Sequence, residues 1–254
     1  MIDYIFLGVF AVCSYLIGNV NWAITISRLK NKDIRDMGSG NPGTLNMSRN
    51  FGIKLGLLTF FLDIMKGVVP TLTAYFVFRN RGCFDNTEFL IRDFAIFMSG
   101  LFAVLGHIYP VFLKFKGGKG IATTIGVFIV CQSVLGWQWA LISIMALVAA
   151  GVFIYFTEFG AMGSFIAITP PAVGASIYLF LNYADKGKPT ILIYLITNMM
   201  IFAICFFTWF AHRKNIERML AGEEHPTSIK QMAIKHKMKK NETAEENSRT
   251  EDIK

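Results

Sequence analysis

The sequence predicts an all-α fold, a polytopic membrane helix bundle of about seven transmembrane helices with its N-terminus outside and its C-terminus in the cytoplasm. Hydrophobic residues make up 54% of the 254 residues and charged residues only 17%, whereas about a quarter of a soluble domain is charged. The mean hydropathy is +0.47. We therefore expect one multi-pass membrane domain over residues 1–223. Residues 224–254 form a charged cytoplasmic tail that is poor in aromatic residues and expected to be disordered.

The apolar runs define the expected spans in order. The first run follows no basic segment and is longer than a signal-peptide core, so we expect it to be retained. The fourth run is short for a span and could be a half-helix or a tilted segment, which leaves five or six spans as alternatives. The expected spans are Tyr4–Ile26, Leu55–Phe78, Phe94–Phe112, Ile121–Gly136, Trp137–Phe156, Phe159–Tyr183 and Thr190–Ala211.

Lysine and arginine residues predict the orientation, because cytoplasmic loops are enriched in both. Most basic residues fall after the first, third and seventh spans. The opposite loops hold only Arg79, Arg81, Arg92, Lys186 and Lys188. With seven spans the two sets lie on opposite faces, whereas an even number would break the alternation.

Charge and cysteine content exclude several function classes. The net charge is +8, but the basic residues lie in short loops and a tail, which argues against nucleic acid and favours anionic lipid. A tail cluster either touches such lipid or is simply solvated. The four cysteines have neither metal-ligand nor redox spacing, so we expect no metal and no disulfide framework. The tail cluster is Lys235, Lys237, Lys239 and Lys240.

The loop after the third span has the strongest pattern for an anion site. Gly106–Thr124 reads G-H-I-Y-P-V-F-L-K-F-K-G-G-K-G-I-A-T-T. Backbone N–H groups at Gly117, Gly118 and Gly120, around the mobile ammonium of Lys119, suit a phosphate. A plain tight turn is the alternative. His107, near the span end, is either a substrate-binding residue or a simple interfacial histidine.

The loop after the first span is rich in hydrogen-bond donors. Gly38–Arg49 reads G-S-G-N-P-G-T-L-N-M-S-R. Ser39 and Asn46 can bond a hydroxyl or phosphate oxygen, and Arg49 can grip a phosphate with two parallel N–H bonds. The alternative is an ordinary Gly/Pro/Asn turn. Gly38, Gly40 and Asn41 complete the candidate binding loop.

The last span ends in H-R-K-N-I-E-R-M-L-A-G-E-E, His212–Glu224. His212 and Asn215 are three residues apart and share a helix face. Asp63 and Lys66 inside the second span also share a face, and we expect a structural ion pair there, with a supporting role behind the site as the alternative. An interfacial amphipathic helix is the alternative for His212–Glu224. Ser164 and Glu223 are further binding candidates, although helix packing is the default explanation of Ser164.

The three polar segments all fall on the predicted cytoplasmic side, and here the sequence resembles the PlsY-type acyl-phosphate:glycerol-3-phosphate acyltransferases of bacteria. The resemblance runs to about Glu224. Its motifs are G-S-G-N-x-G-x-x-N-x-x-R at Gly38–Arg49, G-H-x-x-P-x-F-L-x-F-K-G-G-K-G-x-A-T at Gly106–Thr123, H-R-x-N-I-x-R-x-L-x-G-x-E at His212–Glu224, and L-D-I-M-K-G at Leu62–Gly67. Two positions depart from the family: Leu45 replaces a threonine and Ala161 replaces a serine.

The resemblance implies transfer of a fatty acyl group from acyl-phosphate to the 1-hydroxyl of glycerol 3-phosphate, in a bacterial inner membrane with the active site facing the cytoplasm. The products are lysophosphatidic acid and phosphate. The implied partners are both substrates, membrane lipid and an acyl-phosphate-producing enzyme, with no cofactor and no nucleic acid. Either His212 or a substrate phosphate takes the proton. The expected catalytic residues are Ser39, Arg49, Lys119, His212 and Asn215.

A second function class stays open. A transporter or a binding protein for a phosphate-containing molecule or lipid could use the same anion site without chemistry, although no inverted repeat favours a transporter. The acyltransferase signature with Asp five residues after His is missing, since Phe112 and Glu217 stand at those positions. No aspartate-rich motif supports a metal-dependent phosphatidyltransferase.

Overall fold

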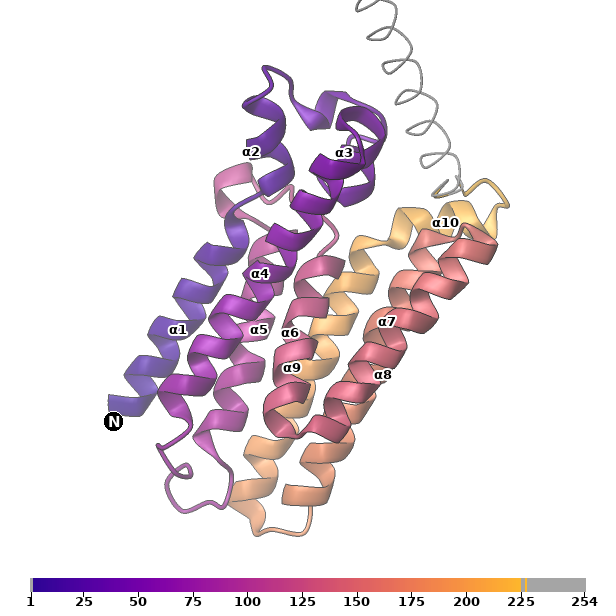
Figure 1. The fold of residues 1–254 in the computed structure, drawn as a ribbon. Coiled ribbons are helices and arrows are strands. Elements are labelled where there is room, and N and C mark those ends of the chain that lie inside the picture. Colours follow the sequence, from indigo (N-terminus) through magenta and orange to yellow (C-terminus); the bar gives the residue numbers. More distant parts are fainter. Residues whose placement is uncertain (1, 225–226, 228–254) are drawn as a thin grey trace, which may run out of the picture.

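The computed structural model describes residues 2–224 and 227, and every named element in this part of the chain is a helix. The prediction of an all-α bundle is therefore confirmed. The short elements α2, α3 and α10 lie at one end of the bundle (Figure 1). The long helices are α1 (Ile2–Asn19), α4 (Ile53–Phe78), α5 (Ile91–Ile108), α6 (Ile121–Leu135), α7 (Trp137–Thr157), α8 (Gly160–Tyr183) and α9 (Lys188–Ala211); the short ones are α2 (Trp22–Arg28), η1 (Ile34–Asp36), α3 (Thr44–Phe51), η2 (Val111–Leu113) and α10 (Arg213–Leu220).

Six segments of the described chain are long and apolar enough to cross a membrane. The helix α6 is shorter, at 15 residues, whereas a span needs about 20. Most of its side chains are buried, and it runs through the body of the bundle beside α4 (Figure 1). Protein neighbours, not lipid, therefore surround this helix. Seven crossings and an outside N-terminus stay predictions.

The expected first span, Tyr4–Ile26, lies within one candidate membrane span, Asp3–Arg28, but its helix is interrupted between α1 and α2. The side chain of Asn21 accepts a hydrogen bond from the N–H of Ile24 at 3.0 Å and so starts a new helix. The break leaves the carbonyl oxygen of Val20 outside the helical pattern. Lys66 Nζ donates to that oxygen at 2.7 Å.

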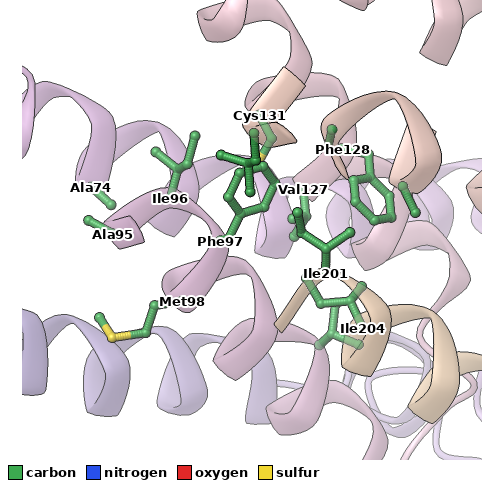
Figure 2. Close-up of a cluster of buried hydrophobic side chains, with 14 of the residues drawn as sticks. Ala74, Ala95, Ile96, Phe97, Met98, Val127, Phe128, Cys131, Ile201 and Ile204 are labelled. Carbon is green, nitrogen blue, oxygen red and sulfur yellow. The ribbon is translucent and has the colours of Figure 1, made fainter. Parts of the chain in front are cut away.

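The core forms where α4, α5, α6 and α9 meet. Figure 2 shows Phe97, Val127, Phe128, Ile201 and Ile204 facing one another there, all of them buried. Glycines allow two of the helix pairs to touch through their backbones. A Cβ atom on Gly106 of α5 would lie 2.1 Å from Tyr15 O of α1, and one on Gly126 of α6 would lie 2.2 Å from Ile64 O of α4.

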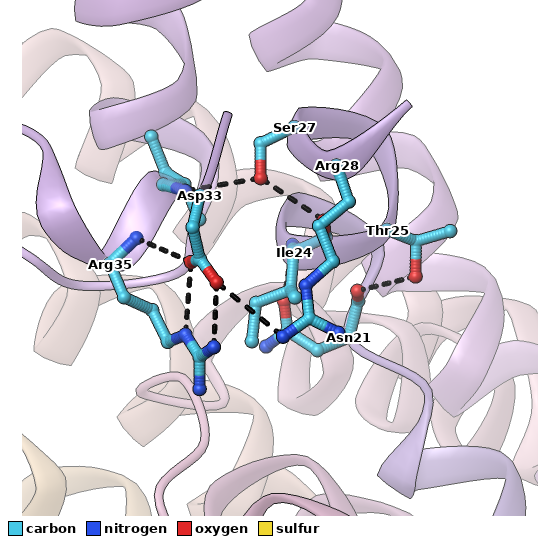
Figure 3. Close-up of polar contacts among 8 residues, drawn as sticks. Asn21, Ile24, Thr25, Ser27, Arg28, Asp33 and Arg35 are labelled. Carbon is cyan, nitrogen blue, oxygen red and sulfur yellow. Dashed lines mark hydrogen bonds and ion pairs between the residues drawn. The ribbon is translucent and has the colours of Figure 1, made fainter. Parts of the chain in front are cut away.

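The segment between α2 and α3 is ordered by side-chain bonds (Figure 3). Asp33 accepts from the backbone N–H of Arg35 at 3.0 Å and from its guanidinium at 2.9 and 2.6 Å. These hydrogen bonds hold the pKa of the Asp33 carboxyl well below its usual range. Ser27 Oγ accepts from the N–H of Ile34 at 3.1 Å. The α2–η1 unit therefore forms a fixed base for the glycine-rich loop that begins at Gly38.

Beyond residue 223 the structure describes Glu224 and Thr227. The N–H of Thr227 donates to Glu158 O at 2.8 Å, and Thr227 is buried. The chain after α10 therefore packs on the turn between α7 and α8. The lysine cluster at residues 235–240 lies outside the described residues, and the boundary at residue 223 stays a prediction.

Candidate active site

The glycine-rich loop at residues 117–120 packs against the last turn of α5. The N–H of Gly117 donates to Ile108 O at 3.1 Å, and the N–H of Gly118 donates to His107 O at 3.2 Å. These two N–H groups are therefore used within the protein, and the expectation that they are free for an anion is wrong. The glycines are needed for close packing instead. A Cβ atom on Gly117 would lie 2.0 Å from His107 O, and one on Gly118 would lie 2.2 Å from His107 Nε2.

The start of α6 provides the backbone donors that the loop lacks. Gly120 has φ +83°, a left-handed conformation that favours glycine, and it caps the helix. The N–H groups of the first helical turn have no carbonyl partner within a helix, and the helix dipole makes this end positive. Such an end suits a phosphate oxygen. Lys119, Gly120 and the first turn of α6 together form the candidate anion cradle.

Lys119 joins this cradle to α10. Lys119 Nζ donates to Asn215 Oδ1. Asn215 Nδ2 donates to Glu224 Oε1 at 2.6 Å, and Arg218 Nε donates to Glu224 Oε2 at 3.0 Å. Burial lowers the pKa of Lys119 to about 8; Glu224 opposes this shift, whereas Arg218 and Arg49 add to it. Since Arg49 is part of this electrostatic environment, the structure brings all three polar segments together.

His212 lies at the junction of α9 and α10 and is only 4% exposed. Its Nδ1 is 2.9 Å from Thr208 O, and because a carbonyl oxygen only accepts, Nδ1 carries the proton. Its Nε2 is then an acceptor. Burial, and secondly the charge of Lys119, lower the pKa of His212 to about 4, so the ring is neutral at pH 7. A neutral imidazole with a free acceptor nitrogen fits a proton acceptor.

Asn46 organises the first loop. It is 2% exposed, and its Nδ2 donates to Ile34 O at 3.1 Å and Met37 O at 2.9 Å. Its Oδ1 accepts from the N–H of Ser39 at 3.2 Å and from Asn50 Nδ2 at 3.0 Å. Because these bonds use the whole amide, the structure supports a role for Asn46 in ordering the loop, and its predicted bond to a substrate oxygen stays a prediction.

The rest of this loop leaves some groups accessible. Gly38 and Gly40 have φ values of +56° and +68°, so both need glycine. Ser39 is exposed, and its Oγ accepts from the N–H of Asn41 at 3.4 Å, which leaves the hydroxyl proton free to donate. Arg49 is exposed on α3, a helix that begins at Thr44 within the segment expected to be a loop.

Three predicted residues take other places. Ser164 Oγ donates to Gly160 O of its own helix at 2.8 Å. Glu223 is exposed, and Glu224 is the acidic residue that joins Asn215. His107 is buried in the last turn of α5, beneath Gly118, so the interfacial alternative is wrong. Glu224 is not among the residues predicted from the sequence, although the third motif ends on that residue.

The two departures from the family pattern lie near the start of α8. A Cβ atom on Gly160 would lie 3.7 Å from Leu45 Cδ1, so the Leu45 side chain points toward the start of α8. Ala161 is buried in the first turn of α8. The departures therefore leave Lys119, Asn215 and His212 themselves unchanged.

An apolar groove of about 530 Å³ lies between α8 and the junction of α9 with α10. The ring of Phe165 in this groove is 5.6 Å from the ring of His212. The groove therefore begins beside the polar site and has the chemistry of a hydrocarbon-binding surface. Its lining residues are Phe165, Ile166, Thr169, Pro170, Trp209 and Ile216.

Known proteins resemble the whole bundle. A family model described as glycerol-3-phosphate acyltransferase matches residues 8–222. The chain is 37% identical to a glycerol-3-phosphate acyltransferase of Aquifex aeolicus (strain VF5), with 87% of this chain and 97% of the relative covered. It is 35% identical to one of Finegoldia magna, with 87% and 96% covered. The crystal structure of PlsY (YgiH), an integral membrane glycerol 3-phosphate acyltransferase in its glycerol 3-phosphate form, superposes with a TM-score of 0.61 at 32% identity over 87% of this chain and 94% of that chain.

Proposed function

Since this chain belongs to the glycerol-3-phosphate acyltransferase family, we propose that it transfers a fatty acyl group from acyl-phosphate to the 1-hydroxyl of sn-glycerol 3-phosphate. The products are lysophosphatidic acid and inorganic phosphate. In this reaction the hydroxyl oxygen attacks the acyl carbon, the bond to the phosphate oxygen breaks, and the hydroxyl proton is removed. An acyl-phosphate is already activated, so no covalent enzyme intermediate is required.

The observation that carries the proposal is the convergence of Lys119, Asn215 and His212. Lys119 stands at the N-terminal end of α6, where an ammonium and unpaired N–H groups can stabilise negative charge on the leaving phosphate. Arg49 and Ser39, accessible on the neighbouring segment, are the candidates for the phosphate of the acceptor. Together they hold two anionic substrates in one place, which is the main requirement of this reaction.

His212 is suited to receive the hydroxyl proton. It is neutral at pH 7 and its Nε2 is free to accept, because Nδ1–H is fixed on Thr208 O. A phosphate oxygen of either substrate is the competing acceptor. Replacing His212 by glutamine distinguishes them: loss of about 10² to 10⁴-fold in kcat supports the histidine, and a change below about threefold supports the phosphate.

The apolar groove beside Phe165 is the proposed place of the acyl chain. It opens along α8 and α9, two helices that meet the length and hydropathy of membrane spans, so a chain in the bilayer can enter it. The site end of the bundle faces the cytoplasm of a bacterial inner membrane in this proposal, because exposed basic residues such as Lys30, Lys114 and Lys116 lie on the loops there. An acyl-phosphate-producing enzyme is the proposed partner that supplies this donor.

The test is phosphate release by the purified protein in detergent, given palmitoyl-phosphate with and without glycerol 3-phosphate. Release that requires the acceptor and yields one lysophosphatidic acid per phosphate supports the proposal. Binding of glycerol 3-phosphate without release, by folded protein, would contradict it and favour the non-catalytic transporter or binding protein. An acyl transfer seen only with a thioester donor would correct the donor and leave the family assignment in place.

A further inference from the structure

An ion pair is buried inside the bundle, away from the groups that face the substrates. Asp63 and Lys66 lie one turn apart on α4, and both side chains are 4% exposed. Lys66 Nζ is 2.9 Å from Asp63 Oδ1. Charges within a membrane span are costly and commonly serve function, and the mechanism above uses neither residue.

The surroundings of Lys66 fix the protonation of His107. Lys66 Nζ donates to Val20 O at 2.7 Å and to Gly18 O at 3.4 Å, and it lies 2.8 Å from His107 Nδ1. Its contact with Asp63 Oδ1 at 2.9 Å is an ion pair. An ammonium has three donors and no acceptor, so His107 Nδ1 must accept. The ring proton is then on Nε2.

Thr123 does not change this assignment. Its Oγ1 is 3.2 Å from His107 Nδ1, but it donates its single proton to Asp63 O at 3.0 Å. The hydroxyl of Thr123 therefore cannot replace Lys66 as the donor to the ring. The ammonium of Lys66 alone orients the imidazole of His107 through Nδ1.

The opposite edge of the His107 ring supports the loop that carries Lys119. A Cβ atom on Gly118 would lie 2.2 Å from His107 Nε2, so this ring edge lies directly beneath the Gly118 α-carbon. The N–H of Gly118 also donates to His107 O at 3.2 Å. The ring and the backbone carbonyl of His107 therefore both contact the loop at Gly118.

Close helix crossings make this support rigid. A Cβ atom on Gly67, the residue after Lys66, would lie 2.2 Å from Thr123 O of α6. One on Gly106, the residue before His107, would lie 2.1 Å from Tyr15 O of α1. The helices α1, α4, α5 and α6 therefore pack closely near the ion pair, and His107 itself is only 4% exposed.

We propose that Lys66, neutralised by Asp63, is a positioning residue for the acyl-transfer site. It sets the tautomer and orientation of His107, and His107 places the Gly117–Gly120 loop so that Lys119 reaches Asn215. Lys66 does not touch a substrate. The inference rests on the proposed function for its activity assay, whereas the tautomer of His107 can be measured without any substrate.

The first test uses the double variant Asp63→Asn/Lys66→Met, which removes both charges together and leaves no unpaired buried ion. We expect a folded protein with kcat/KM for glycerol 3-phosphate lowered by about 10²-fold, the loss typical of a misplaced catalytic group. The control is Tyr183→Phe, which removes a 2.7 Å hydrogen bond to the buried Asp93. That variant is expected to lower the melting temperature and keep kcat/KM. A folded double variant within twofold of the wild type would overturn the proposal.

The second test reads the tautomer of His107 directly by 15N NMR of histidine-labelled wild-type protein, with the signal assigned by its loss in His107→Gln. We expect a neutral ring with the proton on Nε2. A proton on Nδ1 would overturn the proposal even where the double variant does not fold. This measurement needs no substrate. A wild type that releases no phosphate from acyl-phosphate but shows the Nε2–H tautomer would therefore contradict the proposed donor and leave the role of Lys66 standing.

Discussion

Lys119 and Asn215 are 96 residues apart in the chain, and the ammonium of the one donates a hydrogen bond to the amide oxygen of the other. This bond joins the start of α6 to α10. Asn215 in turn binds Glu224, which also accepts from Arg218. The anion cradle is therefore held from two sides, by α5 beneath the glycine loop and by α10 beside Lys119.

Gly118→Ala tests the support beneath the loop. The added Cβ atom would lie 2.2 Å from His107 Nε2, so either the loop or the ring must move. We expect kcat/KM for glycerol 3-phosphate to fall by about 10²-fold or more, because Lys119 is displaced with the loop. Gly151→Ala in α7 is the matched control, since a Cβ there meets nothing within 4 Å. Equal activity of the two variants would contradict the packing argument.

Asn46→Ala tests the role assigned to this buried amide. The substitution leaves the carbonyls of Ile34 and Met37 and the N–H of Ser39 without their partner. We expect loss of about 1 to 3 kcal/mol of stability and a raised KM for glycerol 3-phosphate, measured by thermal unfolding and steady-state kinetics. Asn182→Ala, an exposed asparagine bonded to Tyr178 O, is the control and is expected to change neither quantity. A raised KM without loss of stability would instead indicate that Asn46 binds the substrate.

The pH dependence of the rate tests the charge of Lys119. Its pKa is lowered to about 8 by burial, so the ammonium is present below pH 8 and is lost as the pH rises through that value. We expect kcat/KM to fall on the alkaline side near pH 8. Lys119→Arg keeps its charge throughout this range. Whatever its absolute rate, this variant should lack the alkaline fall, and a fall at the same pH would assign the titration to another group.

Glu224→Gln tests the same alkaline fall of kcat/KM, and the charge of Glu224 determines the direction in which the fall moves. The charge of Glu224 raises the pKa of Lys119 and so opposes the effect of burial. Removing that charge lowers the Lys119 pKa further, and the alkaline fall moves to lower pH. Glutamine keeps a side chain that can bond Asn215. Glu223→Gln is the control, because Glu223 is exposed and stands beside the network without joining it in the described contacts. A shift in the control alone would reverse the assignment of these two residues.

Hydropathy and the motifs were sufficient to predict the all-α membrane bundle and its polar segments. The orientation that the basic residues predict stays a prediction. Hydropathy and the motifs were not sufficient for features that depend on how helices meet. At the break before Asn21, Lys66 of α4 donates a hydrogen bond to Val20 O, a contact between residues far apart in the sequence. The use of the Gly117 and Gly118 N–H groups depends on the end of α5, which the loop covers.

The candidate site likewise combines residues that the sequence predicts with contacts that depend on how the helices pack. The motifs pointed to Lys119, His212 and Asn215, which the structure brings into one environment, and their roles stay predictions. Asn46 looked equally suitable from its type, but its amide is fully used by the neighbouring loop. Burial and local partners, which the sequence does not show, distinguish a residue that organises the site from one that faces it.

The most direct measurement of the central claim compares Lys119→Ala with Lys116→Ala in acceptor-dependent phosphate release from palmitoyl-phosphate. Both substitutions remove one lysine charge from the same loop, but Lys116 is exposed and Lys119 bonds to Asn215. We expect Lys119→Ala to lower kcat/KM by about 10² to 10³-fold and Lys116→Ala to stay within about twofold, since an exposed charge contributes little. Equal activity of the two variants, both folded, would contradict the assignment of Lys119 as the cation that stabilises the leaving phosphate.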